Sequence, residues 1–150
     1  MSEPTIQELT AQTISEANSL SLKPGQEAYI APETYAHAEQ DLDPAGSWPR
    51  VAVVDGHVVG YLMGTFDEDA AEDYMRAGIW RVNVDAPAQG GGVGRFLVEA
   101  FAQEAKARGF DRITVVWAPG ERGPGGFFEH VGFRVVGQTK FGENLGELRL

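Results

Sequence analysis

Residues 84–101, VDAPAQGGGVGRFLVEAF, decide how this chain folds. Four glycines fall between Gln89 and Arg95, directly before a segment with helical periodicity. Because glycine loses more backbone entropy on folding than any other residue, such a cluster needs a specific purpose. A helix N-terminus carries unpaired N–H groups and a partial positive charge, and glycines there leave an anion free to approach the backbone.

The segments on either side of the glycines predict a strand, a helix and a second strand. From residue 93 to 108 the apolar positions recur every three or four residues, which is typical of an amphipathic helix, and Gly109 follows as a stop signal: Val93, Leu97, Ala100, Phe101 and Ala105. The run 74–85, YMRAGIWRVNVD, precedes the glycines as a central strand, and 111–117, DRITVVW, follows the helix. A helical crossover of this kind predicts that the two strands are parallel.

The rest of the chain predicts one domain over residues 1–150, of the mixed α+β class. The clearest local signal is 48–66, where two β-rich runs flank Asp55-Gly56, a dipeptide suited to a tight hairpin turn. Further expected elements are a strand at 5–9, helices at 10–20, 33–41 and 125–132, and strands at 133–140 and 144–150. The order indicates a mixed sheet with helices on its faces.

Composition excludes several classes of function. The chain has no cysteine, and its three histidines, His37, His57 and His130, show no metal-ligand spacing. A net charge of −10 argues against a nucleic-acid partner, because phosphate binding needs clustered Lys and Arg, and it favours cationic small molecules. No apolar run is long enough to span a membrane and the first residues lack a signal pattern, so we expect no membrane partner and a cytoplasmic protein.

Three kinds of glycine loop can be compared with this segment. A dinucleotide fingerprint, G-x-G-x-x-G, fails because its third glycine falls on Arg95 or Leu97. A P-loop fails because no Gly-Lys-Ser/Thr follows. The pattern Gln/Arg-x-x-Gly-x-Gly/Ala is met by Gln89, Gly92 and Gly94, and it predicts a pyrophosphate held by the helix N-terminus.

In this setting the chain resembles the GNAT superfamily of N-acetyltransferases. The resemblance rests on the hairpin, the strand WRVNVD, the Gln-x-x-Gly-x-Gly turn with its helix, and FFEHVGF at 127–133, which is similar to the family's FYxKLGF. Residues 117–138 and 29–39 also resemble a bacterial spermine/spermidine-type subgroup, which carries VPGxGxPExFYxKLGF and VAPNxYSLAEA. The resemblance implies a mostly antiparallel sheet of about six or seven strands in which a splayed parallel pair binds acetyl-coenzyme A.

The resemblance also implies the residues that bind acetyl-coenzyme A. Backbone groups of the central strand would hold the pantetheine arm, and N–H groups of the turn would hold the pyrophosphate. The expected set is Val82, Asn83, Val84, Gln89, Gly90, Gly91, Gly92, Val93, Gly94, Arg95 and Phe128.

The acid–base residues depart from the family pattern. An acceptor amine must lose a proton before it attacks the thioester, and the leaving thiolate benefits from a proton donor. The family often uses a glutamate of the central strand and the tyrosine of FY, but residues 75–84 contain no carboxylate and Phe128 replaces the tyrosine. Glu121 also stands where the subgroup often has asparagine. Solvent, or one of the tyrosines at 35, 61 and 74, could protonate the thiolate instead.

Acceptor-side residues are expected from the two ends of the chain that border the cleft in the family. Glu33 is the first candidate for the general base, with His37 reachable on similar grounds. The substrate-binding candidates are Tyr35, Glu143 and Glu147, and Tyr29 and Trp48 could line the same pocket. The acceptor would be a primary amine such as a polyamine. The alternatives are a protein, peptide or amino-acid amine, or a non-catalytic module that binds acyl-coenzyme A. By the same resemblance the protein could form a homodimer.

Overall fold

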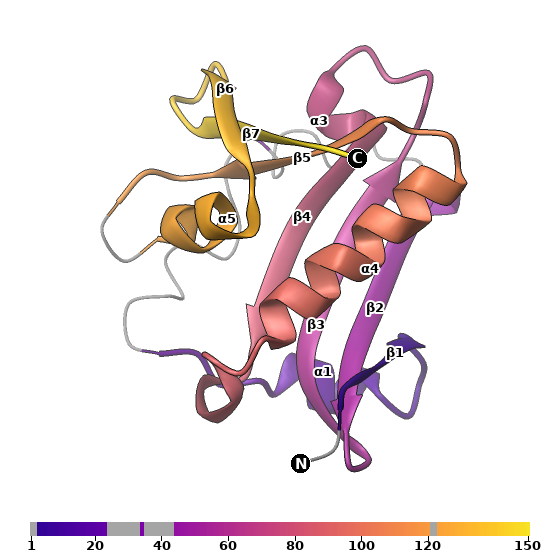
Figure 1. Cartoon of the computed structure of the whole chain (residues 1–150). Coiled ribbons are helices and arrows are strands. Elements are labelled where there is room, and N and C mark those ends of the chain that lie inside the picture. The colour runs from indigo at the N-terminus through magenta and orange to yellow at the C-terminus, as the bar shows by residue number, and fades with distance from the viewer. Residues whose placement is uncertain (1–2, 24–33, 35–43, 121–122) are drawn as a thin grey trace.

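The computed structural model describes residues 3–23, 34, 44–120 and 123–150. These residues form one seven-stranded sheet in the order β1-β2-β3-β4-β5-β7-β6, together with four α-helices (Figure 1). The elements are β1 (Thr5–Glu8), α1 (Ile14–Asn18), β2 (Ser47–Val54), β3 (His57–Phe66), α3 (Asp73–Arg76), β4 (Ala77–Val84), α4 (Val93–Ala107), β5 (Arg112–Trp117), α5 (Gly125–Val131), β6 (Arg134–Gln138) and β7 (Asn144–Arg149). None of the helices in these parts of the chain combines the length and apolar character needed to cross a bilayer.

The hairpin predicted at Asp55-Gly56 is confirmed. Both residues have positive φ, 51° and 82°, which matches the right-handed twist of the strands that they connect. Strands β2 and β3 pair antiparallel from Ser47↔Thr65 to Val54↔His57. The β1–β2 and β3–β4 pairs are also antiparallel, so the first four strands form a meander.

The two faces of the sheet carry different cores. Helix α4 lies across one face (Figure 1), and its buried residues Leu97, Val98 and Phe101 pack against β2, β3, β4 and β5 in the larger cluster. A smaller cluster on the other face joins Val51 and Val58 to residues of the α1 region. Where the register is regular, alternation along β3 and β4 therefore assigns each side chain to one of these two faces.

Trp48 belongs to the larger core, which corrects the expectation that it lines an acceptor pocket. Its side chain is buried, and its ring makes edge contacts with Phe66 at 6.3 Å and Phe101 at 5.7 Å between centroids. The alternating pattern of β2 places it inward, and an indole ring fills core volume as readily as it lines a pocket.

The parallel pair predicted around the long helix is confirmed, and it is short. Strands β4 and β5 pair only at Gly78↔Thr114 and Ile79↔Val115. At the same level the β3–β4 register shifts, since Met63 pairs with Arg81 and Gly64 with Ile79, so Trp80 is an extra residue on β4. Such a bulge bends and twists its strand, and β4 and β5 diverge beyond it.

Two expected elements differ from the structure. The strand expected from residue 74 begins at Ala77, because residues 73–76 form the short helix α3, with Met75 buried and Arg76 bound to Asp73 at 3.0 Å. The helix expected at 10–20 is limited to α1, Ile14–Asn18. The helix expected at 33–41 lies outside the described residues except for Thr34.

Candidate active site

A cavity of about 500 Å³ opens where β4 and β5 diverge. Its walls come from the second half of β4, the turn before α4, the middle of β5 and helix α5. Every residue expected to bind the cofactor lines it except Gly91: Val82, Asn83, Val84, Gln89, Gly90, Gly92, Val93, Gly94, Arg95 and Phe128. Its volume is in the range of small-molecule sites.

The start of α4 presents free backbone donors to this cavity. Gly92 is the N-cap residue, with φ of 89°, and as a glycine it has no side chain that could cap the N–H groups of the first turn. The first N–H groups of a helix have no intrahelical partner, so those of residues 93–95 are available to an anion. Backbone N–H groups without a helical partner, at the positive end of a 15-residue helix that lines a cavity, fit a pyrophosphate.

The four glycines do not all serve the same purpose. Gly90 and Gly92 have φ of 85° and 89°, and a β-carbon at either would meet no atom within 4 Å. At Gly94, by contrast, a β-carbon would lie 2.8 Å from two ring atoms of Phe127. Gly90 and Gly92 thus allow the left-handed turn, and Gly94 allows α4 and α5 to pack closely.

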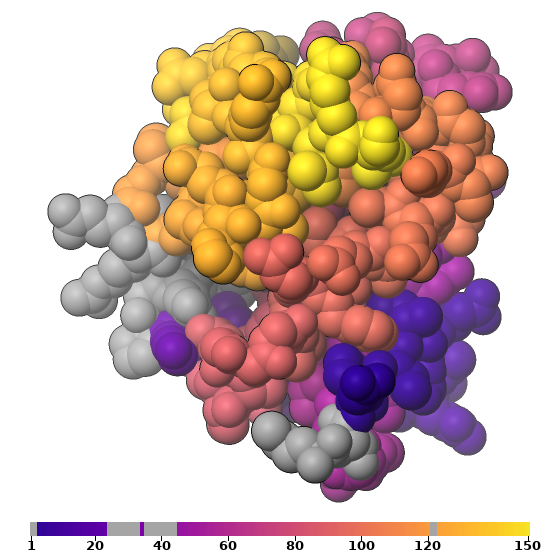
Figure 2. Space-filling view, in the orientation of Figure 1, coloured from indigo at the N-terminus to yellow at the C-terminus, as the bar shows by residue number. Residues whose placement is uncertain are grey.

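Gln89 ties the turn to the end of β4. Its side-chain nitrogen donates a hydrogen bond of 2.9 Å to the carbonyl oxygen of Val84. A second polar contact joins α4 to α5: the Arg95 guanidinium donates a hydrogen bond of 3.4 Å to the carbonyl oxygen of His130. The beginning of α4 and helix α5 meet at the surface in Figure 2, and these two contacts hold the walls of the cavity together.

Phe128 forms the inner wall of the cavity. It is buried, and its ring stacks on Trp117 with 5.5 Å between centroids and contacts Phe133 edge-on. This position supplies an apolar surface and no hydroxyl group. A proton donor for a leaving thiolate is therefore absent from the residue at which the family resemblance expects one.

The acceptor-side candidates of the N-terminal half lie largely outside the described residues. Glu33, Tyr35, His37 and Tyr29 are all in this group, as is Glu121 of the later loop. Thr34 is described, and it connects that segment to Glu143: its backbone N–H and its hydroxyl both donate to Glu143 Oε1, at 2.8 and 2.6 Å. Glu143 is buried, so this carboxylate anchors residue 34 to the start of β7.

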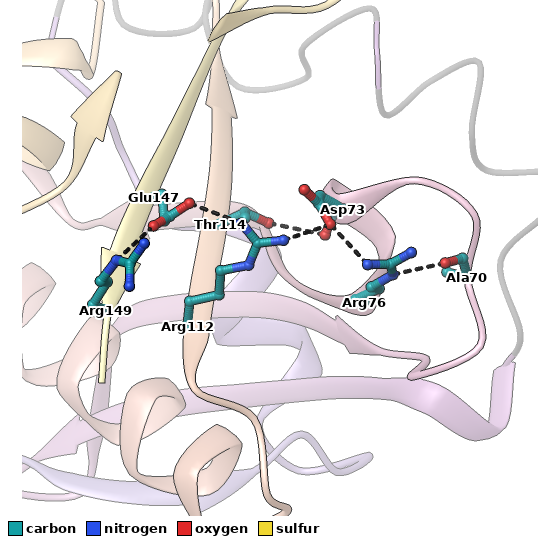
Figure 3. A network of polar contacts seen from close by, with 7 residues as sticks. All are labelled: Ala70, Asp73, Arg76, Arg112, Thr114, Glu147 and Arg149. Atoms are coloured by element: carbon teal, nitrogen blue, oxygen red, sulfur yellow. Dashed lines mark hydrogen bonds and ion pairs between the residues drawn. The ribbon is translucent and has the colours of Figure 1, made fainter. Parts of the chain in front are cut away.

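Glu147 belongs to an ion-pair network and not to the cavity. Its Oε2 accepts from Arg112 at 2.9 Å and its Oε1 from Arg149 at 3.2 Å, and Arg112 continues to Asp73 at 2.7 Å (Figure 3). The hydrogen bond to Glu147 raises the pKa of Arg112. Glu147 pairs in register with Thr114, on the side of the β4–β5 ladder away from the divergence, and it does not line the cavity.

Several residues that line the cavity were not predicted from the sequence, and among them Arg81 is the charged residue of β4. Arg81 lies on β4 directly after the bulge and lines the cavity. Burial raises the pKa of Tyr61 on β3, and the positive charge of Arg81 offsets part of that rise. A lone charged residue inside the apolar run 77–84 was the available signal. Tyr74 is in α3, before β4, and does not line the cavity.

Solved structures with the same fold cover nearly the whole chain. The ribosomal-protein-S18-alanine N-acetyltransferase of Escherichia coli is 17% identical with a TM-score of 0.64, over 97% of this chain and 93% of that one. A GNAT family acetyltransferase of Elizabethkingia anophelis with acetyl-CoA bound is 15% identical with a TM-score of 0.65, over 99% of both chains.

A third structure, the N-acetylglutamate synthase of Neisseria gonorrhoeae complexed with coenzyme A and N-acetyl-glutamate, is longer. It is 17% identical with a TM-score of 0.69, over 100% of this chain and 36% of that one. No curated protein sequence gives a significant match. The family model described as the acetyltransferase (GNAT) family matches residues 14–133. With the mixed sheet, the short parallel ladder and the cavity at its end, this match shows that the chain belongs to the GNAT acetyltransferase family.

Proposed function

We propose that this protein is an N-acetyltransferase that transfers the acetyl group of acetyl-coenzyme A to a small primary amine. The observation that carries the proposal is the cavity between the diverging strands, with the bare N-terminus of α4 at one end and β4 along one side. Acetyl-coenzyme A joins a phosphate-rich end to a long amide-bearing arm, so it matches a site that combines free helix amides with a strand edge.

The residues that would hold the cofactor follow from this geometry. N–H groups at residues 93–95 would bind the pyrophosphate, with Arg95 as an added cation. The ladder to β5 ends at Ile79, so the backbone edge of residues 82–84 that faces the cavity has no strand partner among the described residues and can pair with pantetheine amides. Phe128 would pack against the arm near the thioester.

The reaction is direct transfer. The acceptor ammonium releases a proton to solvent, and its nitrogen attacks the thioester carbonyl carbon. A C–N bond forms, the nitrogen gives up a second proton to solvent and the C–S bond breaks, which yields the N-acetyl amide and coenzyme A thiolate. The thiolate takes a proton from solvent, because Phe128 carries no hydroxyl group. This scheme needs no metal and no covalent enzyme intermediate.

The cavity does not favour a polyamine acceptor. Among its described lining residues the ionisable side chains are Arg81, Arg95 and His130, and none is a carboxylate. A polycation would meet positive charge there in spite of the net charge of −10 of the whole chain. Spermine and spermidine, which the subgroup resemblance suggested, are therefore the comparison substrates and not the proposed ones.

The test combines cofactor binding with thiol release. Isothermal titration with acetyl-coenzyme A should give saturable binding that Gly92→Val weakens, because a branched side chain at φ of 89° distorts the turn that presents the amides. Thiol release should then follow from an amine panel of amino acids, their amides, lysine peptides, spermidine and spermine. Tight binding without release on any amine would show an acyl-coenzyme-A-binding module in place of an enzyme.

A further inference from the structure

Arg81 is placed where the reacting end of the cofactor would lie. It follows the bulge residue Trp80, at the level where the parallel ladder ends. Three residues of extended strand, about 10 Å, separate it from Val84, and the turn to the α4 amides comes after that. Arg81 is thus remote from the phosphate-binding end of the cavity and close to the divergence of β4 and β5.

The side chain of Arg81 is on the face of the sheet opposite to α4. Val82 and Val84 pack against the core that contains α4, so the alternate residues Arg81 and Asn83 point to the other face. Tyr61, which pairs in register with Asn83, packs there against the smaller core cluster, as do Leu20 and Ala17 of the α1 region. Three polar side chains therefore gather beside the cavity on the α1 side: Tyr61, Arg81 and Asn83.

Arg81 also differs from most other arginines in having no carboxylate partner. Six of the described arginines lie within 4.0 Å of an acid: Arg50, Arg76, Arg95, Arg108, Arg112 and Arg149. Among the residues that the structure describes, Arg81 and Arg134 make no such pair, and only Arg81 lines the cavity. Arg81 is exposed at the edge of the cavity. In a chain with ten more acids than bases, a guanidinium there with no acid partner among the described residues is available for a ligand.

The chemistry of the site points to a carboxylate on that ligand. A guanidinium presents parallel N–H donors that match the two oxygens of a carboxylate, and a neutral phenol and an amide beside it add further donors. Tyr61 is protonated at neutral pH, as a phenol with the ordinary pKa near 10 is, and burial raises its pKa further. A purely cationic acceptor would be repelled by the same group.

We propose that Arg81 binds a carboxylate of the acceptor, and hence that the acceptor is an amine that carries a carboxylate near its nitrogen, such as an amino acid. This rests on the proposed function, because it places the acceptor amine next to the thioester in the same cavity. Tyr61 and Asn83 complete the binding of the carboxylate. Bound in this way, the acceptor directs its nitrogen toward the divergence of β4 and β5, where the thioester carbonyl would lie.

The test uses substrate pairs that differ only in this group. Each common amino acid is compared with its carboxamide, and both with spermidine, by kcat/KM in the thiol-release assay. The wild-type protein should prefer the carboxylate member of the best pair by about ten- to a hundredfold. In Arg81→Gln that preference should fall to near unity through a rise in the acceptor KM, while Arg81→Lys should keep part of it.

Arg134→Gln is the matched control, since Arg134 is the other arginine without an acid partner among the described residues and is exposed on β6, outside the cavity lining. It should keep the wild-type preference. Three results would each overturn the assignment of Arg81. The wild type could use an amino acid and its carboxamide at equal rates, or it could prefer spermidine. Alternatively, Arg81→Gln could change the KM of acetyl-coenzyme A and not that of the acceptor. No release with any amine would instead refute the enzymatic function itself, and the acceptor assignment with it.

Discussion

Replacing Gly94 with alanine tests whether the first turn of α4 needs a residue without a side chain at this position. A β-carbon at this position lies 2.8 Å from two ring carbons of Phe127, so the contact must lengthen by about 0.6 Å to reach the 3.4 Å at which ordinary van der Waals contact begins. Phe127 is itself in edge contact with Phe128 at 5.2 Å between centroids, which limits how its ring can move. The strain is therefore passed to the packing of α5 against α4.

Overpacking of this kind costs about 1–3 kcal/mol, which for a domain of this length corresponds to a fall in Tm of about 3–9 °C. Thermal unfolding followed by circular dichroism measures it. Affinity for acetyl-coenzyme A, measured by titration calorimetry, should fall in the same variant because Phe127 and Gly94 both line the cavity.

Two further variants separate packing from glycine content. Gly126→Ala, on α5 with nothing within 4 Å of its β-carbon, should leave stability unchanged or slightly raised. Combining Gly94→Ala with Phe127→Leu should recover about 1 kcal/mol relative to the sum of the single changes, because the smaller side chain relieves the contact. A Tm for Gly94→Ala within 1 °C of wild type would refute the close-packing explanation for this glycine.

Three other predictions follow from the site and its surroundings. Glu147→Gln should lower the free energy of unfolding, measured by urea denaturation, by about 1–3 kcal/mol, because it weakens the bonds to Arg112 and Arg149. A change in the KM of the acceptor would instead show that Glu147 contributes to acceptor binding. Tyr61→Phe should lose less of its free energy of unfolding at high pH than the wild type does. Because folding raises the pKa of Tyr61, the wild type loses stability as the pH rises from about 10 through the folded-state pKa. Equal losses of stability in the two proteins would contradict this. Phe128→Tyr should raise kcat and add a basic limb to its pH profile near the phenol pKa of about 10, by supplying a proton donor to the thiolate; unchanged turnover and profile would show that solvent suffices.

Much of the fold could be predicted because its signals are local. The Asp55-Gly56 turn needs two positive φ angles, and both residue types tolerate them. Helix α4 needs one apolar stripe, and Val93, Leu97, Phe101 and Ala105 are all buried as the spacing predicts. The bulge at Trp80 and the helical turn at 73–76 were not predicted, because both depend on partners distant in sequence, Met63 and Gly64 for the first and Arg112 for the second.

The cofactor half of the site was easier to predict than the acceptor half for a similar reason. Free amides and glycines at a strand-turn-helix junction form a contiguous segment, so their spacing carries the information. Glu143 and Glu147 looked equivalent in sequence, two acids on one strand end, yet one binds Thr34 and the other binds Arg112. Arg81 could be recognised as unpaired only once the positions of all described acids were known.

The two-pair ladder between β4 and β5 has a mechanical consequence. The sheet consists of a four-stranded half and a three-stranded half that share a single short seam, at Gly78↔Thr114 and Ile79↔Val115. Cooperative units in proteins separate where few bonds connect them, so amide hydrogens along this seam should exchange before those inside either half. A ligand that spans the opening supplies the missing cross-links and raises stability by mass action. The cofactor would then be both a reactant and an additional connection between the two half-sheets, which the larger core already joins through α4.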